Sequence, residues 1–254
     1  MKIKEIRVKS ILSRSKVHDW TLNPYRGCEH GCFYCYARFM RRFTAHKEKW
    51  GEFVDVKVNA PELLAEEVRR KKKGRVWISG VCDPYQPLEK KYKLTRRSLK
   101  IFQENSWPVI IQTKSPLVLR DLDLLKKFED IEVGFTITTA DEEIKKFFEP
   151  RTPSIEERMK ALERMHQEGI KTYVMIAPLL PGAEVLVSEL EGKIDYAIID
   201  KMNYHYADWV YRRYKIEKFK EDRFFIQKGK EIAELFKMKK IPCQLVFQEP
   251  KRYL

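Results

Sequence analysis

The stretch NPYRGCEHGCFYCYARFM, residues 23–40, carries three of the five cysteines of the chain. Cys28, Cys32 and Cys35 form the pattern C-x3-C-x2-C, and Gly27 and Gly31 allow the backbone to turn tightly around a bound group. Three thiolates on one short loop can hold three corners of a cubic iron–sulfur cluster, whereas four cysteines would saturate a [4Fe-4S] cluster. The spacing therefore predicts a cluster in which one iron is open to a ligand that the protein does not supply.

A zinc site is the alternative interpretation of these thiols. Zinc prefers four ligands, and structural zinc sites usually add a second C-x2-C pair downstream, which this sequence lacks. His30 lies between two of the cysteines and cannot easily share their metal. His46, or one of the isolated cysteines Cys82 and Cys243, could complete a zinc site, although nothing in the spacing supports this.

Length and composition indicate a globular protein. The chain has 254 residues, 43% of them hydrophobic, enough for one large domain or two small ones. No apolar run approaches the length of a membrane span, and the basic N-terminus lacks the apolar stretch of a secretory signal. In a reducing compartment, clustered thiols are more often metal ligands than disulfides. We therefore expect a cytoplasmic protein with no membrane association.

Strand-like and helix-like segments alternate through the middle of the chain, which is typical of a parallel sheet with right-handed crossovers. Ser154 and Glu157 form a capping box that predicts the start of one helix, and Gly169 predicts its end. The segment 116–128 is expected to be helical, with Pro116 at its start. We expect strands at 75–80, 107–113, 131–138, 170–178 and 195–200, with 53–59 as a further strand near the start.

Six such units predict an α/β fold, a partial (β/α)6 TIM-like barrel of parallel strands. The carboxyl ends of the strands would converge on one face, where sites in such sheets are built. We expect residues 1–200 to form this core, including the cysteine loop at 23–40. Residues 201–254 would be an aromatic and basic extension packed on it.

The positive charge is concentrated at the two ends of the chain. The net charge is +14, of which +8 falls in residues 1–50 and +7 in residues 201–254, while residues 51–200 contribute −1. Basic ends attract polyanions such as DNA or RNA, although solubility alone is the alternative explanation. The extension could stack bases and pair phosphates, or form an amphipathic helix on the core; its aromatic and basic residues are Tyr204, Tyr206, Trp209, Tyr211, Arg212, Arg213 and Tyr214.

The C-x3-C-x2-C pattern followed by an aromatic residue resembles the radical SAM superfamily. Other segments resemble its spore photoproduct lyase-related branch, often labelled DNA repair photolyase-like. They are DPYQPLEKKYKLTR (83–96), TKSPLVLRDLDLL (113–125), EPRTPSIEERMKAL (149–162) and IAPLLPG (176–182), and they occur in matching order. With the cysteine motif, the resemblance covers roughly residues 20–185.

The resemblance implies a [4Fe-4S] cluster on Cys28, Cys32 and Cys35, with S-adenosylmethionine chelated at the open iron. Electron transfer from the cluster would cleave the sulfonium, and the resulting 5′-deoxyadenosyl radical would abstract hydrogen from a substrate. It also implies an electron donor such as ferredoxin or flavodoxin. The expected substrate is nucleic acid, in a lesion repair-like or modification reaction. The alternatives are a radical SAM enzyme acting on a protein or small molecule, and a non-catalytic iron–sulfur or zinc binding module.

The resemblance also assigns residues to S-adenosylmethionine. Tyr36 would approach the adenine, unless it only packs the loop. Candidates for the methionyl amino group are Ser79, Gly80 and Asp83, since carbonyls and a carboxylate suit an ammonium donor; Asp83 could instead cap the loop before Pro84. Lys114 would pair with the methionyl carboxylate, unless it is solvated.

Hydroxyls and arginines complete the expected cofactor site. Thr136 and Thr138 would suit the ribose, although threonine is also an ordinary strand residue. Arg151 and Arg158 would reach the carboxylate or ribose, unless they pair with surface glutamates.

Two residues are expected to be catalytic. Tyr34 matches a tyrosine near the hydrogen-transfer path, and a structural tyrosine is the alternative. Cys82 could donate hydrogen to the product, or be a small buried side chain. Here the sequence departs from the lyase, because the lyase's cysteine lies further upstream of its aspartate, and relatives of this branch usually have threonine at the Cys82 position.

Overall fold

The computed structural model describes residues 1–247, and within them the main sheet has eight strands in the order β11-β10-β9-β8-β7-β6-β3-β2. Strands β3 to β11 of this sheet run parallel, and only β2 is antiparallel to its neighbour. The strands are β2 (Leu12–Arg14), β3 (Trp20–Leu22), β6 (Val76–Ile78), β7 (Val109–Thr113), β8 (Ile131–Thr136), β9 (Lys171–Ile176), β10 (Tyr196–Ile199) and β11 (Cys243–Leu245). The predicted parallel α/β fold is confirmed; closure into part of a barrel stays a prediction.

Five of the expected strands are found in this sheet as β6 to β10, but the strand at 53–59 is not. That segment forms β5 (Phe53–Lys57), which pairs with β1 (Lys2–Ile6) and β4 (Tyr25–Arg26) in a small second sheet. The prediction that it belongs to the main sheet is wrong. Strand β3, directly before the cysteine loop, pairs with β6 in the main sheet instead. Because β3 has only three residues, it is too short to show a periodic pattern in the sequence.

Helices connect the strands. The α-helices are α1 (Ala60–Arg70), α2 (Glu89–Tyr92), α3 (Leu94–Glu104), α4 (Leu122–Leu125), α5 (Glu142–Phe148), α6 (Ile155–Gln167), α7 (Leu186–Glu189), α8 (Asp208–Arg213) and α9 (Asp222–Met238). Short 3-10 helices are η1 (Tyr36–Phe43), η2 (Pro116–Asp121), η3 (Ala183–Val185), η4 (His205–Ala207) and η5 (Glu217–Lys220). In this part of the chain, no helix is long and apolar enough to span a bilayer.

The capping box is confirmed, because the Ser154 and Glu157 side chains each accept a hydrogen bond from the other residue's backbone N–H at the start of α6. The segment expected to be helical at 116–128 is helical from Pro116 to Leu125, but not as one continuous α-helix. The segment divides into η2 and α4 at Asp121, whose buried carboxylate accepts hydrogen bonds from Arg96, Arg120 and Tyr85.

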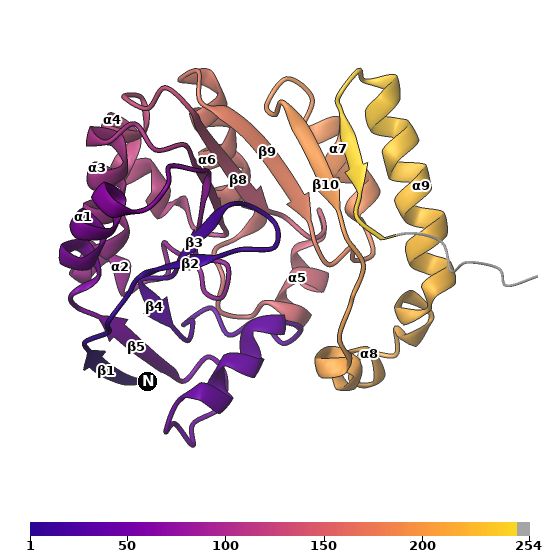
Figure 1. The fold of residues 1–254 in the computed structure, drawn as a ribbon. Coiled ribbons are helices and arrows are strands. Elements are labelled where there is room, and N and C mark those ends of the chain that lie inside the picture. Colours follow the sequence, from indigo (N-terminus) through magenta and orange to yellow (C-terminus); the bar gives the residue numbers. More distant parts are fainter. Residues whose placement is uncertain (248–254) are drawn as a thin grey trace, which may run out of the picture.

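The C-terminal segment extends the main sheet instead of only covering it. Strand β11 pairs in parallel with β10, and α9 lies beside it at one end of the molecule, with the small sheet at the other end (Figure 1). Phe225, Ile232 and Phe236 of α9 belong to the same hydrophobic core as the strands. The domain boundary at residue 200 stays a prediction, and residues 248–254 of the expected extension lie outside the described part.

Candidate active site

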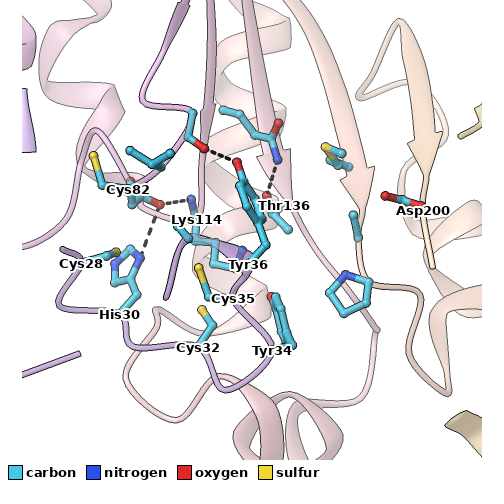
Figure 2. Close-up of a pocket in the computed structure, with 18 of the residues that line it drawn as sticks. Cys28, His30, Cys32, Tyr34, Cys35, Tyr36, Cys82, Lys114, Thr136 and Asp200 are labelled. Atoms are coloured by element: carbon cyan, nitrogen blue, oxygen red, sulfur yellow. Dashed lines mark hydrogen bonds and ion pairs between the residues drawn. The ribbon is translucent and has the colours of Figure 1, made fainter. Parts of the chain in front are cut away.

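A cavity opens at the carboxyl ends of the parallel strands. Its wall includes residues that follow β6, end β7 and β8, and follow β9 and β10. Because parallel strands present their carboxyl ends at the same edge, side chains far apart in sequence meet here. The cysteine loop lies against this edge, and Cys28, Cys32 and Cys35 all line the cavity (Figure 2).

Local hydrogen bonds shape the cysteine loop. The N–H of Gly31 donates to the Cys28 carbonyl at 3.2 Å, and the N–H of Cys35 donates to the Cys32 carbonyl at 3.2 Å. Within residues 1–247, no three His, Cys, Asp or Glu side chains are close enough to hold one metal ion together. A single tetrahedral zinc would need such a group, whereas cluster cysteines each bind a different iron around a larger volume. The assignment of the three thiols to a cluster stays a prediction.

Glycines let the loop lie close to its support. Gly27 has a φ of +93°, and a Cβ there would overlap the Phe53 carbonyl. Gly31 and Gly51 face each other so closely that a Cβ on Gly31 would lie 3.0 Å from the Gly51 Cα. Arg151 Nη1 donates to the Gly51 carbonyl at 2.6 Å. Arg151 is thus not part of the cavity wall, and it holds the support of the loop instead.

A buried ion pair anchors the other side of the loop. Glu149 Oε2 lies 2.7 Å from Arg158 Nη1, and both side chains are fully buried. The Tyr34 hydroxyl donates to Glu149, and Thr138 Oγ1 donates to it at 3.4 Å. Burial alone would raise the pKa of Glu149, but Arg158, Lys114 and Tyr34 lower it to about 2. The carboxylate is therefore ionised, and it holds Tyr34 in the loop.

Lys114 brings a positive charge to the cavity beside the thiols. Its Nζ lies 4.0 Å from Glu149 Oε1 and 5.6 Å from the centre of the Tyr34 ring. Burial alone would lower the pKa of Lys114, but Glu149 and Cys32 raise it. A cation here offsets the negative charge of thiolates or of a bound carboxylate.

The free thiols themselves are protonated. Burial raises the pKa of Cys32 to about 11 and that of Cys35 to about 12. Metal ligation requires thiolates, so loading a cluster here would release protons.

Asp83 ties the ends of β6 and β7 together. It accepts hydrogen bonds from the N–H of Tyr85 at 2.8 Å, the hydroxyl of Thr113 at 2.6 Å and the N–H of Lys114 at 2.8 Å. His30 Nδ1 lies 3.4 Å from Oδ2, the oxygen that accepts from Lys114, in the range of an ion pair but without hydrogen-bond geometry. Asp83 therefore caps the loop before Pro84, as the alternative interpretation expected, and its carboxylate also lines the cavity.

His30 is a cavity residue that the sequence did not reveal. It belongs to the loop, is almost fully buried, and directs its side chain towards Asp83 (Figure 2). Burial alone would lower the pKa of His30, but Asp83 and Cys28 raise it to about 10. Burial alone would raise the pKa of Asp83, and His30 is the main cause that lowers it to about 2. Only the position between two cysteines could have drawn attention to His30.

Ser79 offers an unsatisfied polar atom. Its backbone has a φ of +65°, and its buried hydroxyl has no hydrogen-bond partner within residues 1–247. Next to it, the Gly80 carbonyl accepts from the Tyr36 hydroxyl (Figure 2). A buried hydroxyl without a partner destabilises the protein unless a ligand satisfies it. Ser79 therefore fits a bound polar cofactor group.

Thr136 and Gln112 form a polar pair on the next strand ends. Gln112 Nε2 donates to Thr136 Oγ1 at 3.1 Å, which leaves the threonine hydroxyl proton available to a ligand (Figure 2). Arg158 stands behind this wall, where its Nη1 donates to the Thr136 carbonyl at 3.1 Å. Gln112 was not expected as a site residue, although it precedes Lys114 by only two positions.

Cys82 lies in the cavity wall with its Sγ 3.5 Å from the Tyr25 carbonyl. Burial raises the pKa of Cys82 to about 12, so the group is a neutral thiol at physiological pH.

The far wall comes from the segment after β10. Asp200 stands apart from the cysteines there (Figure 2), and it accepts hydrogen bonds from the N–H of Lys201 at 2.8 Å and from Asn203 Nδ2 at 2.8 Å. Burial raises the pKa of Asp200. Tyr204 also lines the cavity, and the sequence had assigned it only to the extension. The available signals were that Asp200 ends the strand expected at 195–200 and that Asn203 follows this strand closely.

The structure thus brings most of the expected site residues to one cavity. Those that line it are Cys28, Cys32, Cys35, Tyr34, Tyr36, Ser79, Gly80, Cys82, Asp83, Lys114 and Thr136. Thr138 and Arg151 do not line it. Which of these residues touch a cofactor or substrate stays a prediction.

The chain is similar in sequence and in fold to several known proteins. An uncharacterized protein of Methanocaldococcus jannaschii, MJ0683, is 38% identical over 208 residues, which cover 80% of this chain and 78% of that protein. The fold is similar to that of spore photoproduct lyase complexed with dinucleoside spore photoproduct, with a TM-score of 0.73, 14% identity and coverage of 96% of this chain and 82% of the lyase.

A second similar fold is that of Streptococcus suis SuiB bound to the precursor peptide SuiA. The TM-score is 0.61 at 17% identity, with coverage of 89% of this chain and 48% of SuiB. The model of the radical SAM superfamily matches residues 22–184, which contain the cysteine loop and strands β6 to β9. The chain therefore belongs to the radical SAM superfamily.

Proposed function

We propose that this chain is an enzyme that holds a [4Fe-4S] cluster on Cys28, Cys32 and Cys35 and binds S-adenosylmethionine at the open iron. When bound, these cofactors supply a 5′-deoxyadenosyl radical, which removes a hydrogen atom from a substrate. We propose nucleic acid as the substrate class, in a lyase-like reaction of the lesion-repair kind or a modification.

One arrangement carries this proposal: three thiols of one loop and the polar ends of neighbouring parallel strands share a cavity. A site that only stored metal would not need Ser79, Lys114 and Thr136 around the thiols. Lys114 provides the cation for a carboxylate, the free Ser79 hydroxyl suits a polar group, and the Thr136 hydroxyl can donate to a ribose. Tyr36, held by Gly80, would border the adenine.

Cys82 is the proposed hydrogen donor to the substrate radical. Its neutral thiol can lose its S–H hydrogen to a carbon radical, which forms a C–H bond and leaves a thiyl radical. We propose that Tyr34 lies near the path of hydrogen transfer. Its position is fixed by its hydrogen bond to Glu149 and by Lys114 beside its ring.

The positive charges at the two ends of the chain support nucleic acid as the substrate. Arg38 of η1 lies over the ring of Tyr206, at 5.3 Å from the ring centre, so residues of the basic N-terminal and C-terminal segments meet beside the cavity. The fold likeness to a lyase complexed with a dinucleoside lesion is consistent with this substrate class.

The decisive experiment measures 5′-deoxyadenosine. The protein is reconstituted anaerobically with iron and sulfide, and S-adenosylmethionine and dithionite are added; dithionite replaces the expected ferredoxin or flavodoxin. We expect about four irons per chain, as a [4Fe-4S] cluster requires, and formation of 5′-deoxyadenosine. A loaded cluster without any 5′-deoxyadenosine would support the non-catalytic module, and tightly bound zinc in place of iron would support the zinc site.

Cysteine variants provide the matched control. Cys32→Ala should lose the iron and the product, because the cluster loses one of its three protein ligands. Cys243→Ala should retain both, since Cys243 lies on β11 outside the cavity wall. Equal iron content in the two variants would contradict the ligand assignment.

A peptide or small-molecule substrate is the second candidate, because a similar fold in SuiB accommodates a precursor peptide. Salt dependence separates the two. Affinity for DNA or RNA should fall steeply as salt increases, because binding a polyanion releases its counterions. Weak binding that does not respond to salt would favour the second candidate.

A further inference from the structure

Three tyrosines form a continuous row at the mouth of the cavity. The rings of Tyr36 and Tyr204 are stacked with centroids 6.5 Å apart, and those of Tyr204 and Tyr206 are stacked with centroids 5.6 Å apart. The guanidinium of Arg38 lies over the outer ring, Tyr206. We call Tyr36, Tyr204, Tyr206 and Arg38 the mouth platform.

The platform leads from the cavity to the surface. Tyr36 and Tyr204 line the cavity, whereas Tyr206 is not part of its wall. The three residues are exposed by 40%, 47% and 37% respectively, which is high for large aromatic residues that lie side by side. A molecule that lies on these rings therefore has one end directed into the cavity.

The two segments that meet at the mouth platform carry arginines that form no ion pair within the described residues. Arg38, Arg41 and Arg42 come from η1, and Arg212 and Arg213 come from α8. The ion pairs of residues 1–247 include none of these five, whereas Arg75, Arg96 and Arg120 of the middle segment all pair with carboxylates. A guanidinium without a carboxylate partner beside exposed aromatic rings, as at Arg38, is suited to a phosphate between stacked bases.

We propose that the mouth platform binds single-stranded nucleic acid and directs one nucleotide into the cavity. Bases would stack on the Tyr204 and Tyr206 rings, next to Tyr36 at the adenine of S-adenosylmethionine, and phosphates would pair with the arginines of η1 and α8. This inference rests on the proposed function, because it names the form of nucleic acid that the same cavity would take.

A duplex fits this surface less well. Its bases are already stacked on each other and expose only their edges, so exposed rings gain contact only with unpaired bases. An acidic electron carrier could use the arginines but has no need of a row of tyrosines. It would also obstruct the cavity through which a substrate must enter.

Binding can be measured without any radical chemistry. Fluorescence anisotropy is recorded for a fluorescein-labelled single strand and for the duplex of the same sequence. We expect the single strand to bind more tightly, and Tyr204→Ala and Tyr206→Ala each to weaken it about tenfold. Tyr206→Phe keeps the ring and should bind like the original protein. Equal affinity for strand and duplex, or no loss in the alanine variants, would overturn the proposal.

Charge variants test the phosphate contacts. Arg212→Ala and Arg213→Ala should each lower the slope of log affinity against log salt by about 0.7, as expected for single strands. Matched controls are Tyr92→Ala and Arg70→Ala, whose side chains lie on α2 and α1 outside the cavity wall and should not change binding. Unchanged strand binding together with impaired reduction by flavodoxin would identify an electron-carrier surface and overturn the proposal.

The test of the mouth platform and the test of the proposed function can fail independently of each other. Formation of 5′-deoxyadenosine without nucleic acid tests the cofactors, while anisotropy tests the platform. A protein that cleaves S-adenosylmethionine but prefers duplex refutes only the platform. A protein that prefers single strands but never cleaves S-adenosylmethionine refutes only the cofactor chemistry.

Discussion

Asp83 shows how one carboxylate can set the shape of a site. Its oxygens accept hydrogen bonds from β7 and from the turn after β6, and His30 approaches at 3.4 Å. These contacts place Lys114 and the backbone of residues 79–83 around the same space. Asp83, which the sequence suggests only as a contact for the cofactor or as a loop cap, is therefore also a structural link between two strands.

Replacing Asp83 with asparagine should destabilise the protein. One amide N–H2 would face a backbone N–H or hydroxyl donor, and a buried donor without an acceptor costs about 1–3 kcal/mol of the free energy of unfolding. Urea titration measures this. Asp123→Asn is the control, because Asp123 is exposed and its loss should change stability far less. Equal effects of the two substitutions would contradict this role of Asp83.

At the scale of elements, the cysteine loop is held between two supports. On one side its backbone touches Gly51, and on the other Tyr34 binds the Glu149–Arg158 pair at the junction of α5 and α6. Neither support lies next to the loop in sequence. The geometry of the three thiols thus depends on contacts with other elements.

Gly51→Ala should displace the loop and reduce iron loading. Gly51 has a φ of +93°, and its new Cβ would lie 2.8 Å from the Gly31 Cα. Gly192→Ala is the matched control, since it has a φ of +72° but no atom within 4 Å of the new Cβ. Both substitutions cost about 1–2 kcal/mol of backbone strain. Only Gly51→Ala should also lose iron after reconstitution, and full iron loading in it would refute the contact argument.

Glu149→Gln should change how stability depends on pH. The pKa of Glu149 in the folded protein, about 2, is below its ordinary 4.5. Its ionised form therefore stabilises the fold above pH 4.5, and this contribution is lost as pH falls from 4.5 towards 2. Glu149→Gln leaves Arg158 buried without its partner and should lose about 3–5 kcal/mol at neutral pH.

Urea titrations of both proteins across this pH range provide the measurement. The stability difference between the original protein and Glu149→Gln should narrow as pH falls below 4.5. A difference that stays constant down to pH 3 would show that the carboxylate charge is not the source of the stabilisation.

At the scale of the whole molecule, the C-terminal segment completes both the sheet and the cavity. Strand β11 covers the edge of β10, α9 contributes Phe225, Ile232 and Phe236 to the common core, and Tyr204 lines the cavity. Shared core residues couple the segment to the strands.

We therefore expect one cooperative thermal transition, with equal calorimetric and van't Hoff enthalpies. Ile232→Ala, fully buried in α9, should lower the stability of that whole transition by about 2–5 kcal/mol. Met238→Ala, exposed on the same helix, should have little effect. A separate early transition in Ile232→Ala would show that the segment unfolds on its own.

Local patterns were sufficient for several features. The capping box of α6, strands β6 to β10 and the clustering of three thiols depend on residues close in sequence, so the chain itself predicts them. The sequence could not predict that β3, and not β5, joins the main sheet. The three residues of β3 carry no periodic signal, and the partners of both strands, β6 and β1, are distant in sequence. Arg151 was misplaced for a similar reason, since its partner Gly51 is a hundred positions away.

The amino-acid sequence alone determined the clustering of three thiols, the parallel α/β class and the basic character of both ends, because each follows from residue type and short spacing. Only the tertiary structure decided that Glu149 anchors Tyr34, that Ser79 is left without a partner, and that Tyr36 and Tyr204 stack at one cavity mouth. Those contacts join residues far apart along the chain, and chain folding, not local periodicity, brings them together.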